Sequence, residues 1–208
     1  DLVSSRGLGD VYKRQSIGFK QGDVLALIGD NKPEWVFFEI ACHANGGMSL
    51  GVYRDTLDDE VGYLVKSAKV KFAYAEDQEQ VDKLINVQKK LKTKIKVIYD
   101  DPRGLEKLKN PNVINMRDLA SEGKKQLDKN NKLYENLINK VSGETVSILC
   151  TTSGTTSNPK LAMLPANKFI NHISNYLKVD PKSYLDEYVS VLPFPWIMEQ
   201  TYGVGFNL

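Results

Sequence analysis

Residues that ligate metals or form disulfides are scarce in this sequence, which has two cysteines and two histidines among 208 residues. Cys42 and Cys150 lie far apart, each within an apolar run, so we expect both to be small buried hydrophobic residues in a reducing compartment. His43 and His172 fall within expected helices, where we expect structural or surface roles. No cluster of cysteine and histidine has the spacing of metal ligands, which argues against a zinc site or a disulfide scaffold.

Long apolar runs are also absent. No stretch reaches the roughly 18 residues that a membrane-spanning helix needs, and the first residues lack the apolar centre of a signal peptide, so we expect a cytoplasmic protein. The formal net charge is +2 and the lysines are dispersed, which gives no indication of nucleic-acid binding. We expect the densest positive run, Lys89–Lys96, to be a solvated helix end, with contact to an anionic membrane surface as the alternative.

Two common catalytic motifs are missing as well. The Gly-x-Ser-x-Gly motif that presents a nucleophilic serine does not occur. The Walker motif requires a second glycine before its lysine, and Gly154 has no such partner before Lys160. The sequence therefore disfavours a kinase-like nucleoside triphosphatase.

Strand and helix patterns alternate regularly between residues 23 and 99. Apolar runs of strand length alternate with stretches of helical period, an order typical of a doubly wound α/β fold with a mostly parallel sheet and helices on both faces. Pro33 suits the first position of a helix, and Thr56 with Asp59 forms a capping-box pattern for a helix through Lys66. The other expected elements are strands at Asp23–Ile28, Met48–Tyr53, Val70–Ala75 and Ile95–Tyr99, and a helix at Gln78–Leu91.

Composition divides the chain into four parts. Residues 1–15 lack sustained periodicity and look like a translated adapter sequence, so we expect a non-native tail there. Residues 16–100 form the expected first α/β lobe, and the polar residues 101–144 form an expected connecting segment. Residues 145–208 begin an expected second α/β lobe, which includes a further strand at Glu187–Leu192.

A loop rich in hydroxyl groups follows the apolar run Ile148–Cys150. Small hydroxyl residues around one glycine let the backbone approach an anion, so that N–H groups and hydroxyls donate to several oxygens while a lysine adds positive charge. This pattern predicts a phosphate-binding loop at the end of a buried strand, with a polar surface loop as the alternative. The residues concerned are Thr151, Thr152, Ser153, Gly154, Thr155, Thr156 and Ser157, followed by Lys160.

The run Thr151–Lys160 (T-T-S-G-T-T-S-N-P-K) closely resembles the phosphate-binding signature of the adenylate-forming superfamily, which includes acyl-CoA synthetases, luciferases and peptide-synthetase adenylation domains. Two positions depart from the usual pattern, because Ser157 and Leu161 stand where the family usually has glycine. Ser157 would strain the loop if that position needs a positive φ.

Two other stretches resemble the same family. Gly22–Val36 (G-D-V-L-A-L-I-G-D-N-K-P-E-W-V) is similar to a segment near the start of such enzymes. Leu192–Gln200 (L-P-F-P-W-I-M-E-Q) is similar to a stretch that lines the acyl and nucleotide pocket, with Trp196 in place of the usual histidine. The Asn-x-Pro-Glu-Trp and Met-Glu-Gln patterns are commoner in the long-chain fatty acyl branch.

The resemblance implies an incomplete amino-terminal domain of the adenylate-forming fold, together with a two-step reaction. A carboxylic acid, which the branch resemblance indicates to be a long-chain fatty acid, attacks the α-phosphorus of ATP to give an acyl-adenylate and pyrophosphate, and the thiol of CoA then displaces AMP. ATP, Mg²⁺ and CoA are therefore implied. The resemblance places no catalytic residue among these 208 residues, so we expect them to be inactive on their own.

Individual residues receive roles by the same resemblance. Lys160 would contact the β- and γ-phosphates of ATP, and Thr152 would provide one ligand of Mg²⁺, which accepts few protein ligands. Trp196 would form an apolar wall of the acyl pocket, with core packing as the alternative. Glu199 is expected only to cap the helix that follows Pro195.

Two other interpretations stay open. An amino-acid or aryl-acid adenylating enzyme would carry the same loop. A non-catalytic ATP-binding module is favoured by the departures at Ser157 and Leu161.

Overall fold

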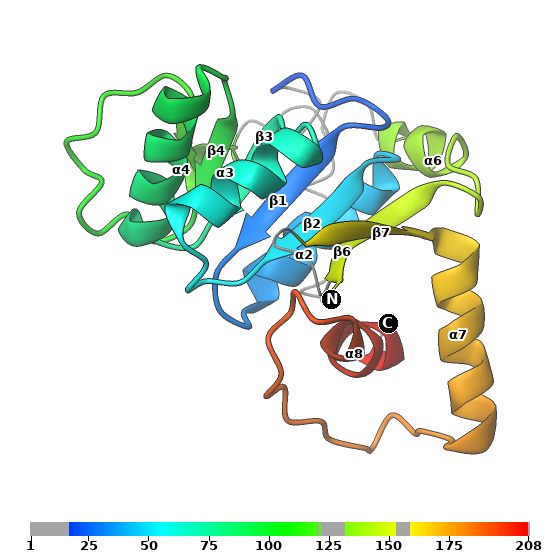
Figure 1. Cartoon of the computed structure of the whole chain (residues 1–208). Coiled ribbons are helices and arrows are strands. Elements are labelled where there is room, and N and C mark those ends of the chain that lie inside the picture. The colour runs from blue at the N-terminus through cyan, green and yellow to red at the C-terminus, as the bar shows by residue number, and fades with distance from the viewer. Residues whose placement is uncertain (1–16, 120, 122–131, 153–158, 208) are drawn as a thin grey trace.

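A computed structural model describes residues 17–119, 121, 132–152 and 159–207. Its centre is a seven-stranded sheet with the order β5-β4-β3-β1-β2-β6-β7 (Figure 1). Neighbouring strands are parallel except for β6 and β7, which are antiparallel. The prediction of a mostly parallel α/β sheet is therefore confirmed. The strands are β1 (Val24–Ile28), β2 (Met48–Val52), β3 (Phe72–Ala75), β4 (Lys96–Tyr99), β5 (Val113–Asn115), β6 (Val146–Thr152) and β7 (Lys160–Pro165).

Local sequence explains where several helices start and stop. Pro33 occupies the start of α2, where its missing N–H costs nothing. The Asp77 side chain accepts a hydrogen bond from the Gln80 N–H and caps α4, and Lys92 ends that helix in a left-handed conformation. The helices are α2 (Pro33–Ala44), α3 (Asp58–Ser67), α4 (Gln78–Leu91), α6 (Leu133–Ile138), α7 (Ala166–Val179) and α8 (Ile197–Glu199), and α8 continues as π-helix Gln200–Val204 and 3₁₀-helix Gly205–Asn207.

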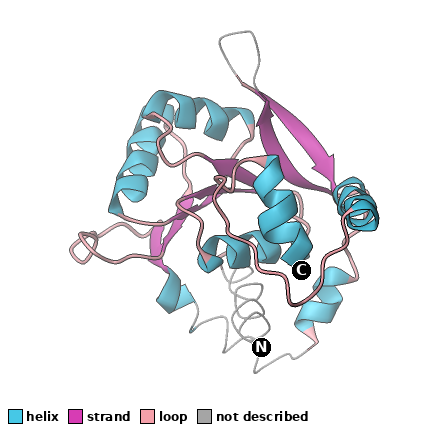
Figure 2. Cartoon of the chain, turned by 90° about the horizontal axis from the view of Figure 1, so that it is seen from below, coloured by secondary structure: helices cyan, strands magenta, loops and turns pink. Residues whose placement is uncertain are grey.

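Both faces of the sheet are covered, because alternate residues of a strand point to opposite faces. On β1, Val24, Ala26 and Ile28 belong to a core that includes residues of α3 and α4. Leu25 and Leu27 belong to a second core that includes Trp35 and Phe38 of α2 and reaches Phe194 and Val204. In Figure 2 the helices (cyan) accordingly lie on both sides of the strands (magenta).

Two predicted features are wrong. Thr56 and Asp59 form no capping box, because α3 begins at Asp58 and Thr56 lies in a turn in which its N–H donates to the Tyr53 carbonyl. The segment Glu187–Leu192 is not a strand, although its apolar residues suggested one. In the described part of the chain the sheet has β5 and β7 at its edges, and this segment instead crosses beside the loop that follows β1.

Strands from three of the predicted parts share one sheet. β5 comes from the segment predicted to connect two lobes, and β6 hydrogen-bonds to β2 in parallel register. The boundaries drawn at residues 100 and 144 stay a prediction. The predicted tail at residues 1–15 lies outside the described residues.

Candidate active site

The two ends of the hydroxyl-rich loop come together at the carboxyl end of the parallel strands. β6 runs parallel to β2, and β7 returns beside it, with Thr152 directly opposite Lys160 and Thr151 opposite Leu161. Residues directly opposite each other on antiparallel strands project from the same face. The Thr152 hydroxyl donates to the Lys160 carbonyl oxygen at 3.4 Å, and both residues are exposed.

The rest of the predicted loop, Ser153, Gly154, Thr155, Thr156 and Ser157, lies outside the described residues. The structure therefore gives the position of Thr151, Thr152 and Lys160 only. The phosphate cradle itself stays a prediction, although its two ends are one hydrogen-bonded pair at the open end of the sheet.

A hollow of about 340 Å³ borders the two threonines, and we call it the Thr152 hollow. Trp196 lies in its wall with 46% of its surface exposed, whereas Trp35, the other tryptophan, is fully buried against Phe194. The place of Trp196 in an acyl pocket stays a prediction. The lining residues are Gly51, Val52, Tyr53, Thr56, Glu60, Leu64, Thr151, Thr152, Pro159 and Trp196.

The residues beside the Thr152 hollow could provide one protein ligand of Mg²⁺ but not a complete metal site. Within the described residues, no three His, Cys, Asp or Glu side chains gather as a metal site. Mg²⁺ in nucleotide enzymes keeps several waters and phosphate oxygens, so a single exposed hydroxyl such as that of Thr152 is a chemically reasonable protein ligand.

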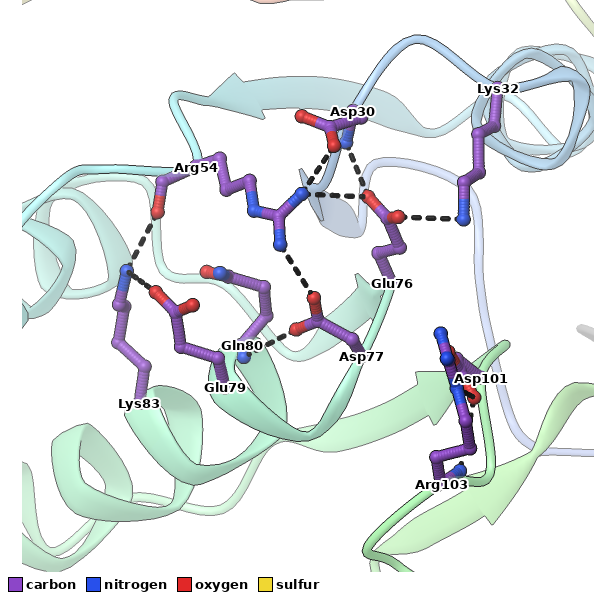
Figure 3. A network of polar contacts seen from close by, with 10 residues as sticks. All are labelled: Asp30, Lys32, Arg54, Glu76, Asp77, Glu79, Gln80, Lys83, Asp101 and Arg103. Carbon is purple, nitrogen blue, oxygen red and sulfur yellow. Dashed lines mark hydrogen bonds and ion pairs between the residues drawn. The ribbon is translucent and has the colours of Figure 1, made fainter.

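Charged residues form a network at the carboxyl ends of β1 and β3, which sequence reasoning missed (Figure 3). The buried Glu76 carboxylate accepts from the Asp30 N–H at 2.5 Å and pairs with Lys32 at 2.6 Å. Arg54 pairs with Asp30 and, at 2.9 Å, with Asp77. Polar residues directly after two predicted strands, Gly29-Asp30 and Glu76-Asp77, were the signal that could have revealed it.

The network shifts the ionisation of its members. Burial alone would raise the pKa of Glu76, but the Asp30 N–H and the Lys32 ammonium outweigh it and hold that pKa below its usual value. The hydrogen bond from Lys32 to Glu76 in turn raises the pKa of Lys32. Glu76 is therefore a fixed negative charge at neutral pH.

Glu199 has a different role from the predicted helix cap. Its side chain is fully buried and accepts hydrogen bonds from the Tyr188 hydroxyl at 2.8 Å and from the Ser190 hydroxyl. The residue preceding α8, Trp196, forms no side-chain cap, and neither does Glu199. Glu199 thus holds the segment before α8 rather than the helix end.

The histidines and cysteines follow the predictions in part. His43 lies on α2 with its Nε2 3.0 Å from the Ser49 hydroxyl, and His172 is exposed beside Tyr176. Cys42 is buried as expected, but Cys150 is only half-buried. Burial, followed by the charge of Glu39, raises the pKa of the Cys150 thiol to about 11, so the thiol stays protonated at neutral pH.

A second, larger cavity of about 510 Å³ lies between α2, α6, α7 and the residues after α8. Most of its lining is apolar, including Ile40, Ile148, Phe169, Ile173 and Val204. The helix α7 contributes Phe169, Ile170 and Ile173 to this lining, and none of its residues is fully buried.

Two solved structures share this fold. The luciferase-like enzyme from the mealworm Zophobas morio aligns with a TM-score of 0.73 over 96% of this chain and 43% of its own, at 14% identity. Apo MatB from Rhodopseudomonas palustris aligns with a TM-score of 0.69 over 98% of this chain and 36% of its own, also at 14% identity. The chain is therefore part of the amino-terminal domain of the adenylate-forming fold.

Residues 14–208 match the family described as AMP-binding enzyme, and the chain belongs to that family. Long-chain-fatty-acid–CoA ligase 5 of Rattus norvegicus is 29% identical over 215 residues, covering 99% of this chain and 31% of the relative. Long-chain-fatty-acid–CoA ligase 1 of Cavia porcellus is 26% identical over 203 residues, covering 94% and 28%. The chain thus spans less than a third of the length of these relatives. Within the described residues, no helix is both long and apolar enough to cross a membrane.

Proposed function

We propose that the complete protein is an AMP-forming acid–CoA ligase that acts on long-chain fatty acids. It uses ATP to convert the acid to an acyl-adenylate with release of pyrophosphate, and CoA then takes the acyl group and releases AMP. The observation that carries the proposal is the β6–β7 pair, which brings Thr152 and Lys160 together at the carboxyl end of the sheet, beside a hollow walled by Trp196.

The described residues would act mainly by placement and charge. The Lys160 ammonium would neutralise the β- and γ-phosphates, and the Thr152 hydroxyl would provide one ligand of Mg²⁺. Mg²⁺, when bound, supplies positive charge to the phosphate oxygens. Thr151 and Thr152 serve as ligands and not as nucleophiles, because the carboxylate of the substrate is itself the attacking group.

The names of the curated relatives support a long-chain fatty acid over an amino acid. The anthranilate–CoA ligase AuaEII has the same fold at 13% identity and a TM-score of 0.62, which leaves an aryl acid as the competing substrate.

Pyrophosphate–ATP exchange in the complete protein tests the role of Lys160. Lys160→Ala should lower the palmitate-dependent exchange rate by about tenfold or more, since loss of one preorganised charge contact commonly costs that much. Lys168→Ala, which removes an exposed lysine on α7, is the control and should leave the rate unchanged. An unchanged rate in Lys160→Ala would remove the role assigned to this lysine.

A panel of acids decides between the substrate classes. CoA-ester formation should rise with chain length across acetate, octanoate and palmitate, and should exceed that with benzoate, anthranilate or aspartate. A preference for an aryl or amino acid would favour the competing enzymes. Complete absence of exchange with every acid would favour the non-catalytic ATP-binding module.

The proposal also includes a cytoplasmic location with peripheral membrane contact. Several exposed lysines follow α3 and α4 or lie at their ends, where the parallel strands begin, and we call five of them the edge lysines. A surface of this charge favours anionic lipid, at roughly 1 kcal/mol for each lysine near the membrane. The edge lysines are Lys66, Lys69, Lys89, Lys92 and Lys94.

A further inference from the structure

Asn31, in the loop between β1 and α2, uses its whole side-chain amide to hold a distant segment. Its Nδ2 donates to the Ser190 hydroxyl at 2.6 Å and to the Leu192 carbonyl oxygen at 2.7 Å. Its Oδ1 accepts from the Phe194 N–H at 3.1 Å. An amide has two N–H donors and one oxygen, so all of its hydrogen-bonding groups are engaged with residues 190–194.

The segment that Asn31 holds has no regular secondary structure to support it. Residues 181–196 contain no helix or strand, and the side chains of Val189 and Val191 are 76% and 73% exposed. In Figure 1 this part of the chain runs as a long loop from the end of α7 to α8. Its position therefore depends on a few specific contacts rather than on regular structure.

The contacts that exist lie close to Asn31. Ser190, which accepts from Asn31, donates in turn to the buried Glu199 carboxylate. Phe194 packs on Trp35, with ring centroids 5.7 Å apart. The next residue, Pro195, lies so close to β2 that a Cβ added to Gly51 would be 2.7 Å from the Pro195 Cα. The chain is thus fixed up to the residue that precedes Trp196.

Asn31 is itself held in place from both sides. The preceding residue, Asp30, donates its N–H to Glu76, and the following residue, Lys32, pairs with the same carboxylate at 2.6 Å (Figure 3). Glu76 follows directly after β3, so the amide of Asn31 is anchored to the centre of the sheet.

We propose that Asn31 is a positioning residue for acid binding, because it sets where Trp196 stands in the wall of the Thr152 hollow. The chain between the last hydrogen bond of Asn31, at Phe194, and Trp196 contains only Pro195, whose ring restricts the backbone. This inference rests on the proposed function and adds a residue outside the hollow to it. Loss of the amide should affect the binding of the acid more than the binding of ATP.

Three variants of the complete protein test the proposal. Asn31→Ala removes all three hydrogen bonds, and Asn31→Asp keeps the acceptor for Phe194 but places a carboxylate oxygen against the Leu192 carbonyl. Ser190→Ala removes one contact only, and it provides a milder test if either Asn31 variant fails to fold. Asn86→Ala is the matched control, since its exposed amide makes one long hydrogen bond, to Asp58, away from this segment.

Two readouts are measured on each variant. We expect KM for palmitate to rise about five- to tenfold in both Asn31 variants, because a displaced Trp196 would no longer position the acid. KM for ATP should stay within about twofold of wild type. We also expect acrylamide to quench Trp196 fluorescence more strongly, measured as the difference between each protein and its Trp196→Phe counterpart. If Asn31 had a purely structural role, its replacement would lower the melting temperature without raising KM for palmitate more than KM for ATP.

Several results would overturn the proposal. Unchanged palmitate KM and unchanged quenching in Asn31→Ala would do so. A loss in kcat with both KM values unchanged would also overturn it. If the wild-type protein shows no exchange with any acid, the proposed function fails. The quenching measurement still decides in that case whether Asn31 positions Trp196.

Discussion

At the scale of residues, Glu76 shows how a buried charge can be stabilised by a few neighbours. The carboxylate is nearly inaccessible, yet it faces the Asp30 N–H and the Lys32 ammonium, and the Arg54 guanidinium lies 4.0 Å away. A buried ion that loses its partners costs several kcal/mol, so the three donors are what allow the charge there. The same carboxylate fixes the loop that carries Asn31.

Replacing Glu76 gives a pH-dependent test. The pKa of Glu76 is lower in the folded state than its usual 4.5, so its contribution to stability is present above that value and is lost as pH falls through the folded pKa. We expect Glu76→Gln to lower the free energy of unfolding by about 1–3 kcal/mol at pH 7. The difference from wild type should shrink below about pH 4.5.

Urea unfolding at several pH values measures this difference. The exposed Glu79→Gln is the control and should change stability by less than about 0.5 kcal/mol at any pH. A Glu76→Gln difference that stays constant, or grows, toward acid would contradict the lowered pKa.

The residues that sequence reasoning found are those with a local pattern. Thr152 and Lys160 were recognisable because they belong to one continuous motif, and the structure places them opposite each other. Asn31 was visible only as part of a resemblance. Its partners lie 159 or more residues away in the sequence, and no local periodicity can indicate a contact over that distance.

At the scale of elements, helix bounds were predictable where capping and period agreed. The prediction Gln78–Leu91 matches α4, which has an aspartate cap and an amphipathic pattern. The predicted strand Glu187–Leu192 failed because an apolar run can form a strand only where another strand offers hydrogen-bonding partners. In the described part of the chain the segment meets a side-chain amide there instead.

Two glycines in neighbouring elements should respond in opposite ways to alanine. Gly51 lies in β2 against Pro195, so an added methyl group would displace the segment before Trp196 and destabilise the protein by about 1–3 kcal/mol. Gly62 lies inside α3, where the nearest atom to a new Cβ is 3.9 Å away. Alanine there should stabilise the protein by roughly 0.5–1 kcal/mol, because glycine weakens helices.

The free energy of unfolding in urea measures both effects, with an unchanged denaturant slope as the sign that only stability has changed. Each variant is the matched control of the other, since both add one methyl group. Destabilisation by Gly62→Ala, or none by Gly51→Ala, would contradict the packing described here.

At the scale of the whole molecule, the direction of the sheet separates two kinds of surface. The candidate active site and the charged network lie where the parallel strands end, whereas the edge lysines lie where they begin. This separation follows from the α/β order, because each of α2, α3 and α4 returns the chain from the end of one parallel strand to the beginning of the next. The sequence predicted the lysine run, but only the fold shows that it lies at the end of the sheet where the parallel strands begin.

Vesicle sedimentation tests the proposed membrane contact. The complete protein should bind vesicles of phosphatidylcholine with phosphatidylserine more tightly than phosphatidylcholine alone, and salt should weaken this binding. Replacing Lys89, Lys92 and Lys94 by glutamate should lower the affinity at least about tenfold. Lys168→Glu, on α7, is the control. Equal binding to both kinds of vesicle would rule out a contact through these lysines.

The distance along the chain between Asn31 and its partners also governs how a nascent molecule matures. Ser190 and Leu192 are synthesised 159 and 161 residues after Asn31, a delay of about 8–32 s at the usual pace of a ribosome. Strands β1–β4 can assemble during that interval, while the amide of Asn31 is hydrated. The segment that carries Trp196 therefore docks late onto a preformed sheet, and until it does a newly made molecule exposes Phe194, which is buried in the folded protein, to chaperones.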